Sequence, residues 1–169
     1  KFLFKWLIKK PKLFFVLNKN IKERLAGAGV PNEKIFIFPS GVDVEDFDIE
    51  ITKDLAREKL GLPLNKKIIL YSGQFYGWKG VNCLADTAEI LPEYLFIFVG
   101  GTSPGLDVFV SKYGNIKNIM TVPFVERGRI PLYLKAADVL AVPNSIKGKI
   151  STHFTSPLKV FEYMASKRP

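Results

Sequence analysis

The sequence has few of the residues that build disulfides and metal centres. Cys83 is the only cysteine among the 169 residues, and His153 is the only histidine. One thiol cannot form an internal disulfide, and one imidazole without a cluster of cysteines or carboxylates does not make a metal site. We therefore expect a protein of a reducing compartment, with Cys83 as a buried thiol and with no metal site.

The sequence also has no apolar run of about 20 residues, the length that a membrane-spanning helix needs. Lysines interrupt its most hydrophobic part, which lies near the N-terminus. The sequence begins with Lys1 rather than methionine, and no signal peptide is recognisable. With 47% hydrophobic residues, the chain can form either one domain-sized core or one core and the remnant of a neighbouring one. We interpret it as a piece of a longer protein, truncated at its C-terminal end.

The net charge of +9 is concentrated near the start of the chain. Residues 1–24 contain eight basic residues against Glu23 alone. Bulky apolar residues alternate with lysines over residues 1–12, which favours peripheral contact with a membrane surface over nucleic-acid binding. The alternative is a helix whose aromatic side chains pack on a missing domain. We expect a cytoplasmic protein that binds no nucleic acid, with the inner membrane surface as one candidate partner.

Apolar runs alternate with segments of helical period from residue 12 onward, the pattern of β/α units and a parallel sheet. The expected strands are residues 12–17, 66–73, 94–101, 118–124 and 138–144, and residues 34–43 are expected to be a strand that runs into a turn. The expected helices are residues 18–29, 54–60, 79–91, 105–114, 130–137 and 156–166. Gly61 is a stop signal for the second of these helices. The strands are apolar at successive positions, so we predict an α/β fold with a Rossmann-like, doubly wound parallel sheet.

Ligands of an open parallel sheet bind at the carboxyl ends of its strands, so the turns after the strands carry the candidate site. The turn SGQFYGWKG, residues 72–80, contains three glycines and places Lys79 at the start of a helix, which suits a phosphate group. This turn matches neither the GxxxxGKS/T nor the GxGxxG pattern, and an ordinary glycine loop is the alternative. The turn VGGTSPG, residues 99–105, is a second candidate for ligand contact or for tight packing.

Two later turns carry further candidates. A planar base could bind near Phe124 with Arg127 close by, or that arginine could simply be solvated. Ser156 can cap the last helix, and Lys159 could add positive charge to a phosphate site there. Glu162 could accept hydrogen bonds from two sugar hydroxyls, or it could be an exposed helical glutamate.

Five segments, in this order and at these separations, resemble the donor-binding half of retaining glycosyltransferases of family 4, which have the two-domain GT-B fold. They are FIFPSGVDVEDF, YSGQFYGWKG, FVGG, LKAADVLAVPNS and SPLKVFEYMASKRP. The resemblance covers about residues 12–169. It implies that residues 1–40 are a remnant of the N-terminal acceptor domain and residues 41–63 an interdomain connector. Residues 64–169 would be an incomplete nucleotide-sugar-binding domain.

The resemblance also implies roles for individual residues. The donor diphosphate would contact Gly73, Gln74, Lys79, Gly80, Ser156 and Lys159. Base binding would involve Phe124 and Arg127, and ribose or sugar binding would involve Leu158 and Glu162. The donor would be a nucleoside diphosphate sugar with UDP or GDP, and the acceptor a lipid-linked or polysaccharide molecule of the cell envelope. Fixed cations and amides would stabilise the departing diphosphate without a metal ion. No cofactor would be needed, because the nucleotide sugar is the substrate.

Two positions depart from the pattern of the family. Gln74 stands where many members have an arginine, and Phe154 stands where the first of two glutamates is often found. We interpret these departures as a subfamily variant with altered donor contacts, and loss of activity is the alternative.

The parent protein is thus expected to be a retaining glycosyltransferase. Its acceptor-side catalytic residues would lie outside this chain, so we expect the chain alone to bind a nucleotide sugar without turnover. Two alternatives stay open: a GT-B epimerase acting on the nucleotide sugar itself, and a noncatalytic module that docks on a membrane or on nucleic acid.

Overall fold

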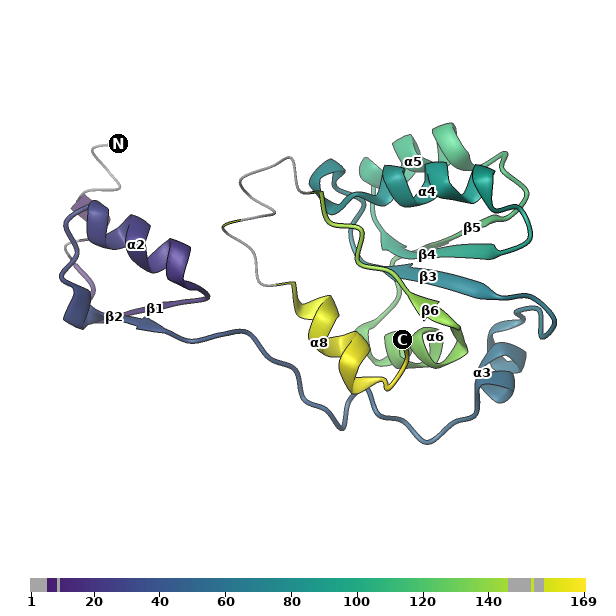
Figure 1. Ribbon diagram of the computed structural model, residues 1–169, viewed down its shortest axis with the longest axis horizontal. Coiled ribbons are helices and arrows are strands. Elements are labelled where there is room, and N and C mark those ends of the chain that lie inside the picture. The colour runs from purple at the N-terminus through teal and green to yellow at the C-terminus, as the bar shows by residue number, and fades with distance from the viewer. Residues whose placement is uncertain (1–5, 9, 146–152, 154–156) are drawn as a thin grey trace. The chain divides into compact units, whose positions relative to one another are not determined.

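The computed structural model describes residues 6–8, 10–145, 153 and 157–169 (Figure 1). The chain divides into two compact units. The first comprises the described residues up to Gly41, together with His153 and Pro157. The second comprises Val42–Ser145 and Leu158–Pro169. Half of the basic segment over residues 1–12, namely residues 1–5 and 9, lies outside the described residues, as do Phe154 and Ser156.

The first unit is a small parallel β/α/β arrangement. Strands β1 (Phe14–Val16) and β2 (Ile35–Ile37) pair in parallel, and α2 (Lys19–Gly27) connects them. The side chain of Asn18 caps α2 by accepting a hydrogen bond from the amide of Ile21 at 3.0 Å. This confirms the strand, helix and strand predicted over residues 12–43. No described helix in either unit is long and apolar enough to span a bilayer.

The second unit contains, within the described residues, a four-stranded parallel sheet with the order β5-β4-β3-β6. Its strands are β3 (Ile68–Ser72), β4 (Leu95–Gly101), β5 (Ile119–Pro123) and β6 (Val139–Leu140). The chain runs from β3 outward to β5 and then returns to the other side of β3. This reversal confirms the predicted doubly wound topology and creates a switch point between β3 and β6.

Helices cover both faces of this sheet (Figure 1). They are α3 (Lys53–Leu60), α4 (Val81–Ile90), α5 (Gly105–Tyr113), α6 (Ile130–Ala136) and α8 (Leu158–Ala165). Ile68 and Leu70 of β3 point into one core with α3, α6 and α8. Tyr71 points into the opposite core with α4 and α5. Successive residues of β3 are thus buried on opposite faces, which is why its sequence is apolar without alternation.

Strand β6 is shorter than the predicted residues 138–144. Pro143 has no amide hydrogen to donate to a neighbouring strand, which limits the ladder beyond Leu140. The carbonyl of Pro143 instead lies where a Cβ atom on Gly80 would be. On β6 the amide of Leu140 donates to the carbonyl of Pro169 at 2.7 Å.

The prediction of a buried Cys83 was wrong, because its side chain is exposed. Helix α4 buries Val81, Ala85 and Ala88, which recur at the spacing of one helical face. Cys83 follows Val81 by two residues, about 200° around the helix axis, and therefore faces away from the core.

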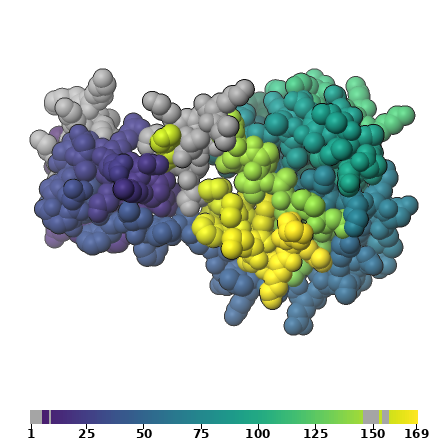
Figure 2. Space-filling view, viewed as in Figure 1, coloured from purple at the N-terminus to yellow at the C-terminus, as the bar shows by residue number. Residues whose placement is uncertain are grey.

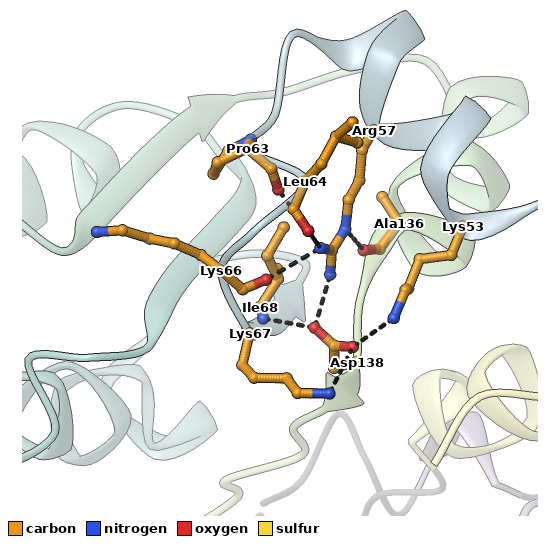
Figure 3. Close-up of polar contacts among 9 residues, drawn as sticks. All are labelled: Lys53, Arg57, Pro63, Leu64, Lys66, Lys67, Ile68, Ala136 and Asp138. Atoms are coloured by element: carbon orange, nitrogen blue, oxygen red, sulfur yellow. Dashed lines mark hydrogen bonds and ion pairs between the residues drawn. The ribbon is translucent and has the colours of Figure 1, made fainter.

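A cluster of charged and carbonyl groups holds α3 to the amino ends of β3 and β6 (Figure 3). Its centre is the ion pair between Arg57, whose side chain is 1% exposed, and Asp138 at 2.6 Å. Arg57 also donates to the carbonyls of Leu64, Lys66 and Ala136. Residues 41–63, predicted as a connector, therefore include a helix that is packed firmly within the second unit.

Candidate functional site

A cavity of about 400 Å³ lies at the switch point of the sheet, at the carboxyl ends of its strands. We call it the switch-point cavity. Strand β3 contributes its last residue, Ser72, and β4 contributes Gly100. The turn after β3 contributes Gly73, Gln74, Tyr76, Trp78 and Lys79. The loop after β5 and the start of α6 contribute Phe124, Val125, Arg127 and Ile130, and α8 contributes Lys159 and Glu162. All of these residues belong to the second unit.

Two short hydrogen bonds fix the conformation of the turn after β3. The hydroxyl of Tyr71 donates to the carbonyl of Gln74 at 2.8 Å. The side-chain oxygen of Gln74 accepts a hydrogen bond from the hydroxyl of Thr102 at 2.8 Å. Gly73 has a φ of 130°, which glycine adopts without strain. The backbone of this turn therefore faces the cavity without a side chain at its first position.

Two lysines place their ammonium groups in this region. The Nζ atom of Lys79 lies 4.2 Å from the ring centroid of Trp78. The Nζ atom of Lys159 lies 5.3 Å from the ring centroid of Tyr71, in the space that a Cβ atom on Gly73 would need. These contacts with aromatic faces are favourable for a cation and hold both side chains near the turn.

Burial and mutual repulsion disfavour the charged forms of the two lysines in the cavity. Burial lowers the pKa of Lys79. Burial, together with repulsion from Lys79, lowers the pKa of Lys159 to about 8, and attraction by Glu162 opposes this shift. A cationic cavity of this kind is stabilised when an anion enters, because the anion offsets both the desolvation and the repulsion.

The loop after β5 supplies apolar surface and one cation. The Phe124 side chain is exposed, and its amide donates to the carbonyl of Gly101 at 3.1 Å. A base near Phe124 would therefore have to use other main-chain groups. Arg127 pairs with Asp46 at 3.8 Å, and its guanidinium carbon lies 5.7 Å from the ring centroid of Phe47.

The structure brings most of the predicted site residues together. Those that line the switch-point cavity are Gly73, Gln74, Lys79, Phe124, Arg127, Lys159 and Glu162. Gly80 and Leu158 are outside its lining; Gly80 packs against Pro143, and the Leu158 side chain is 44% exposed. Ser156, like Phe154, lies outside the described residues. The roles assigned to these residues stay predictions.

Sequence reasoning missed the aromatic part of the site. Tyr76 and Trp78 line the cavity, and their rings stack with centroids 6.4 Å apart. The signal for them was the closeness of both aromatic residues to Lys79 in the turn. Over the part of the chain that the structure describes, no group of three His, Cys, Asp or Glu side chains could hold a metal ion.

Comparison with solved structures identifies the fold. Sucrose-phosphate synthase from Thermosynechococcus elongatus aligns with a TM-score of 0.75 and 22% identity, over 99% of this chain and 42% of that chain. HepE of Anabaena in complex with UDP-glucose aligns with a TM-score of 0.71 and 20% identity, over 94% of this chain and 43% of that chain. These similarities confirm the Rossmann-like fold of the GT-B type that the sequence predicted.

Curated relatives are similar in sequence. D-inositol 3-phosphate glycosyltransferase of Xylanimonas cellulosilytica is 33% identical over 72% of this chain and 31% of its own length. An Escherichia coli protein named UDP-Gal:alpha-D-GlcNAc-diphosphoundecaprenol alpha-1,3-galactosyltransferase is 29% identical over 80% of this chain and 35% of its own length. The chain thus spans about a third of the length of these relatives.

The names of these relatives favour a transferase over the epimerase and over the docking module. The family model of glycosyl transferases group 1 matches residues 52–169, which is more than half of the chain and includes the whole lining of the switch-point cavity. The chain therefore belongs to the glycosyl transferases of group 1, as the five sequence segments indicated.

Proposed function

We propose that this chain binds a nucleoside diphosphate sugar for a retaining glycosyltransferase, which transfers the sugar to a lipid-linked or polysaccharide acceptor. The observation that carries the proposal is the convergence of Lys79, Lys159 and Glu162 on one cavity at the switch point of the sheet. These residues come from two elements that are far apart in the sequence. Such crevices are where doubly wound sheets bind nucleotides.

The cations of the cavity suit a diphosphate. Lys79 and Lys159 bring two ammonium groups to a glycine turn, and burial lowers the pKa of each, with repulsion from Lys79 adding to the shift at Lys159. We expect the diphosphate to lie between these groups, near the main chain of Gly73 and Gln74. Gly80 would act indirectly by shaping the turn, and Ser156 would add a polar contact.

The remaining lining suits a nucleoside and a sugar. Phe124, Val125 and Ile130 offer apolar surface to a planar base, and Arg127 stands at the same wall. Glu162 offers two carboxylate oxygens, which can accept hydrogen bonds from neighbouring hydroxyls of a ribose or sugar ring. Leu158 would lie along the sugar. No cofactor is required in this proposal, because the nucleotide sugar is itself the substrate.

The contribution of this part of the enzyme to catalysis would be electrostatic. Negative charge accumulates on the diphosphate as the bond to the sugar breaks, and fixed cations stabilise that charge more than they stabilise the intact donor. The Escherichia coli relative, whose name includes a UDP-sugar donor and a diphosphoundecaprenol acceptor, supports this class of reaction. Because the chain spans about a third of such relatives, we expect it to bind the donor without turning it over.

Calorimetry with UDP and GDP tests the proposal. We expect one of them to bind, and Lys79→Ala and Glu162→Ala to weaken binding at least about tenfold, the effect of losing one charge-assisted hydrogen bond. Lys59→Ala and Glu58→Ala on the exposed side of α3 are matched controls that should leave the affinity unchanged. Failure of both nucleotides to bind, or equal loss in the controls, would contradict the proposal.

A further inference from the structure

The hydroxyl of Tyr163 takes the place of a strand at the carboxyl end of β3. Consecutive amides of a strand point to opposite edges of the sheet. The amide of Gly73 donates to the carbonyl of Val99 in β4 at 2.7 Å, so the amide of Ser72 points to the other edge, on the side of β6. Strand β6 ends at Leu140, before it reaches this level. The amide of Ser72 donates instead to the hydroxyl of Tyr163 at 2.9 Å.

The contact between Ser72 and Tyr163 is buried and doubled. Their residues are 3% and 5% exposed, and the hydroxyl of Ser72 lies 3.2 Å from that of Tyr163. Burial raises the pKa of Tyr163 to about 12, so its hydroxyl keeps its proton near neutral pH. A buried amide that loses its acceptor is costly, since water cannot replace the missing partner. The hydrogen bond from the Ser72 amide to the Tyr163 hydroxyl therefore fixes α8 to β3, and we call this bond the tie between the two elements.

The tie acts on the part of α8 that faces the cavity. In the space-filling view, α8 lies on the surface of the second unit (Figure 2). Val160 and Met164 of this helix are exposed. Lys159 precedes Tyr163 by four residues and so shares its face of the helix, and Glu162 is its immediate neighbour. A shift or rotation of α8 about this point would move both charged groups.

We propose that Tyr163 is a positioning residue of the donor site, whose hydroxyl holds α8 against the end of β3 and so sets Lys159 and Glu162 against Gly73 and Lys79. Tyr163 is not among the residues that line the switch-point cavity, so it acts through its neighbours. The inference rests on the proposed function, because it assigns the geometry that Tyr163 maintains to the binding of a nucleoside diphosphate.

The test compares two buried tyrosines whose hydroxyls have different hydrogen-bond partners, Ser72 for Tyr163 and Asp86 for Tyr113. Tyr163→Phe removes the tie. Tyr113→Phe is the matched control, because Tyr113 is 2% exposed and donates to Asp86 at 2.7 Å, outside the cavity. With UDP and GDP as probes in calorimetry, we expect Tyr163→Phe to weaken binding about tenfold and Tyr113→Phe to leave it unchanged. Ser72→Ala keeps the amide bond and should give a smaller loss in the same direction.

A second readout needs no nucleotide. In nuclear magnetic resonance, the side-chain signal of Lys159, assigned by its loss in Lys159→Met, should titrate near the value of about 8 that burial, Lys79 and Glu162 produce. In Tyr163→Phe we expect the midpoint to move toward the ordinary lysine value of 10.5, because the ammonium group leaves its place over Tyr71. In Tyr113→Phe the midpoint should stay in place.

The outcomes separate this inference from the proposed function. Failure of the unmodified chain to bind UDP or GDP would count against the proposed function, while the Lys159 titration would still report on the tie. If Tyr163→Phe and Ser72→Ala both keep the unmodified midpoint, Tyr163 does not position Lys159 and the inference is wrong. Circular dichroism shows whether each variant is folded. If Tyr163→Phe does not fold, the titration midpoint of Lys159 in Ser72→Ala tests the inference instead.

Discussion

The ammonium group of Lys159 fills the space beside Gly73 that a Cβ atom would need. Gly73 also has a φ of 130°, which other residues rarely adopt. The turn after β3 thus requires glycine for two reasons, the backbone conformation and the room for a cation. A residue of α8 and a residue of the first turn share one small space, although 86 positions separate them in the sequence.

Substitution of Gly73 should affect both stability and binding. Gly73→Ala places a methyl group against Lys159 and in a disfavoured backbone conformation, so we expect a loss of about 1–3 kcal/mol in the free energy of unfolding. UDP affinity should fall as Lys159 is displaced. The control is Gly77→Ala, where an added Cβ meets nothing within 4 Å. Urea unfolding and calorimetry measure the two effects, and an unchanged affinity in Gly73→Ala would refute the assigned place of Lys159.

Nucleotide binding should depend on pH above neutrality. The pKa of Lys159 is lowered to about 8, chiefly by burial, so its charge is lost in the empty cavity as the pH rises through that value. A bound diphosphate favours the ammonium form, so binding near pH 8 should take up protons and weaken as the pH rises further. Calorimetry in buffers of different ionisation enthalpy measures the uptake. Lys159→Met should reduce it, and equal uptake in that variant would exclude Lys159 as the source.

The cluster around Asp138 should raise the free energy of unfolding without affecting nucleotide affinity. Asp138→Asn leaves the charge of Arg57 buried without its partner, and we expect a loss of about 3 kcal/mol in the free energy of unfolding. The carbonyls that Arg57 also contacts keep the loss from being larger. Asp86→Asn is the control, because Asp86 is 59% exposed and its ion pair with Lys112 is weak. Equal stability of the two variants would contradict this assignment.

Acid should destabilise the second unit through the same carboxylate. Burial alone would raise the pKa of Asp138, but hydrogen bonds from Lys53, the Ile68 amide and Arg57 hold it well below its usual 3.8. The unfolded chain therefore binds a proton in a range where the folded chain does not, and stability falls as the pH decreases below about 4. Urea midpoints measured between about pH 6 and pH 3 should fall less steeply in Asp138→Asn.

The same acid titration has a second contributor. Hydrogen bonds from Lys167 and Lys135 lower the pKa of Asp48, so some dependence on pH should survive in Asp138→Asn. If the variant and the unmodified chain have identical slopes, Asp138 is not the group that titrates.

The basic segment at the start of the chain carries a prediction from sequence alone. Lysines and aromatic residues over residues 1–12 suit adsorption to anionic lipid, where charge and apolar burial act together. We expect the chain to sediment with vesicles containing anionic lipid, less so at high salt, and a version lacking residues 1–10 to stay in the supernatant. Equal sedimentation of both versions would show that this segment does not bind the membrane.

Much of the fold was predictable because its signals are local. The helix over residues 54–60 ends at Gly61, which has a φ of 65° and caps the helix as its position in the sequence indicated. The apolar runs matched β3, β4 and β5, and the topology followed from the alternation of strands and helices. Cys83 was misplaced because its exposure depends on which face of α4 meets the sheet, and the single cysteine carried no information on that.

The candidate site was predictable only in part. Lys79 stood out because it follows a glycine turn, and Glu162 because of its place in a helix after a capping motif. Gly80 belonged to the same turn, yet its role is set by the carbonyl of Pro143, a contact between distant loops. The partners of Arg57 and Tyr163 were not foreseen, because an arginine or a tyrosine inside a helix has the same local pattern whether it is buried or exposed.

The amino-acid sequence by itself determined the order of strands and helices, the family and the turns that could face a ligand. These follow from the periodicity and capping of residues that are close in the chain. Only the tertiary structure decided which turns share one cavity, that Lys159 lies beside Gly73, and that Tyr163 completes the hydrogen bonding of Ser72 across 91 positions. The physical reason is that buried polar groups must find partners wherever packing places them, and packing joins residues that no local pattern connects.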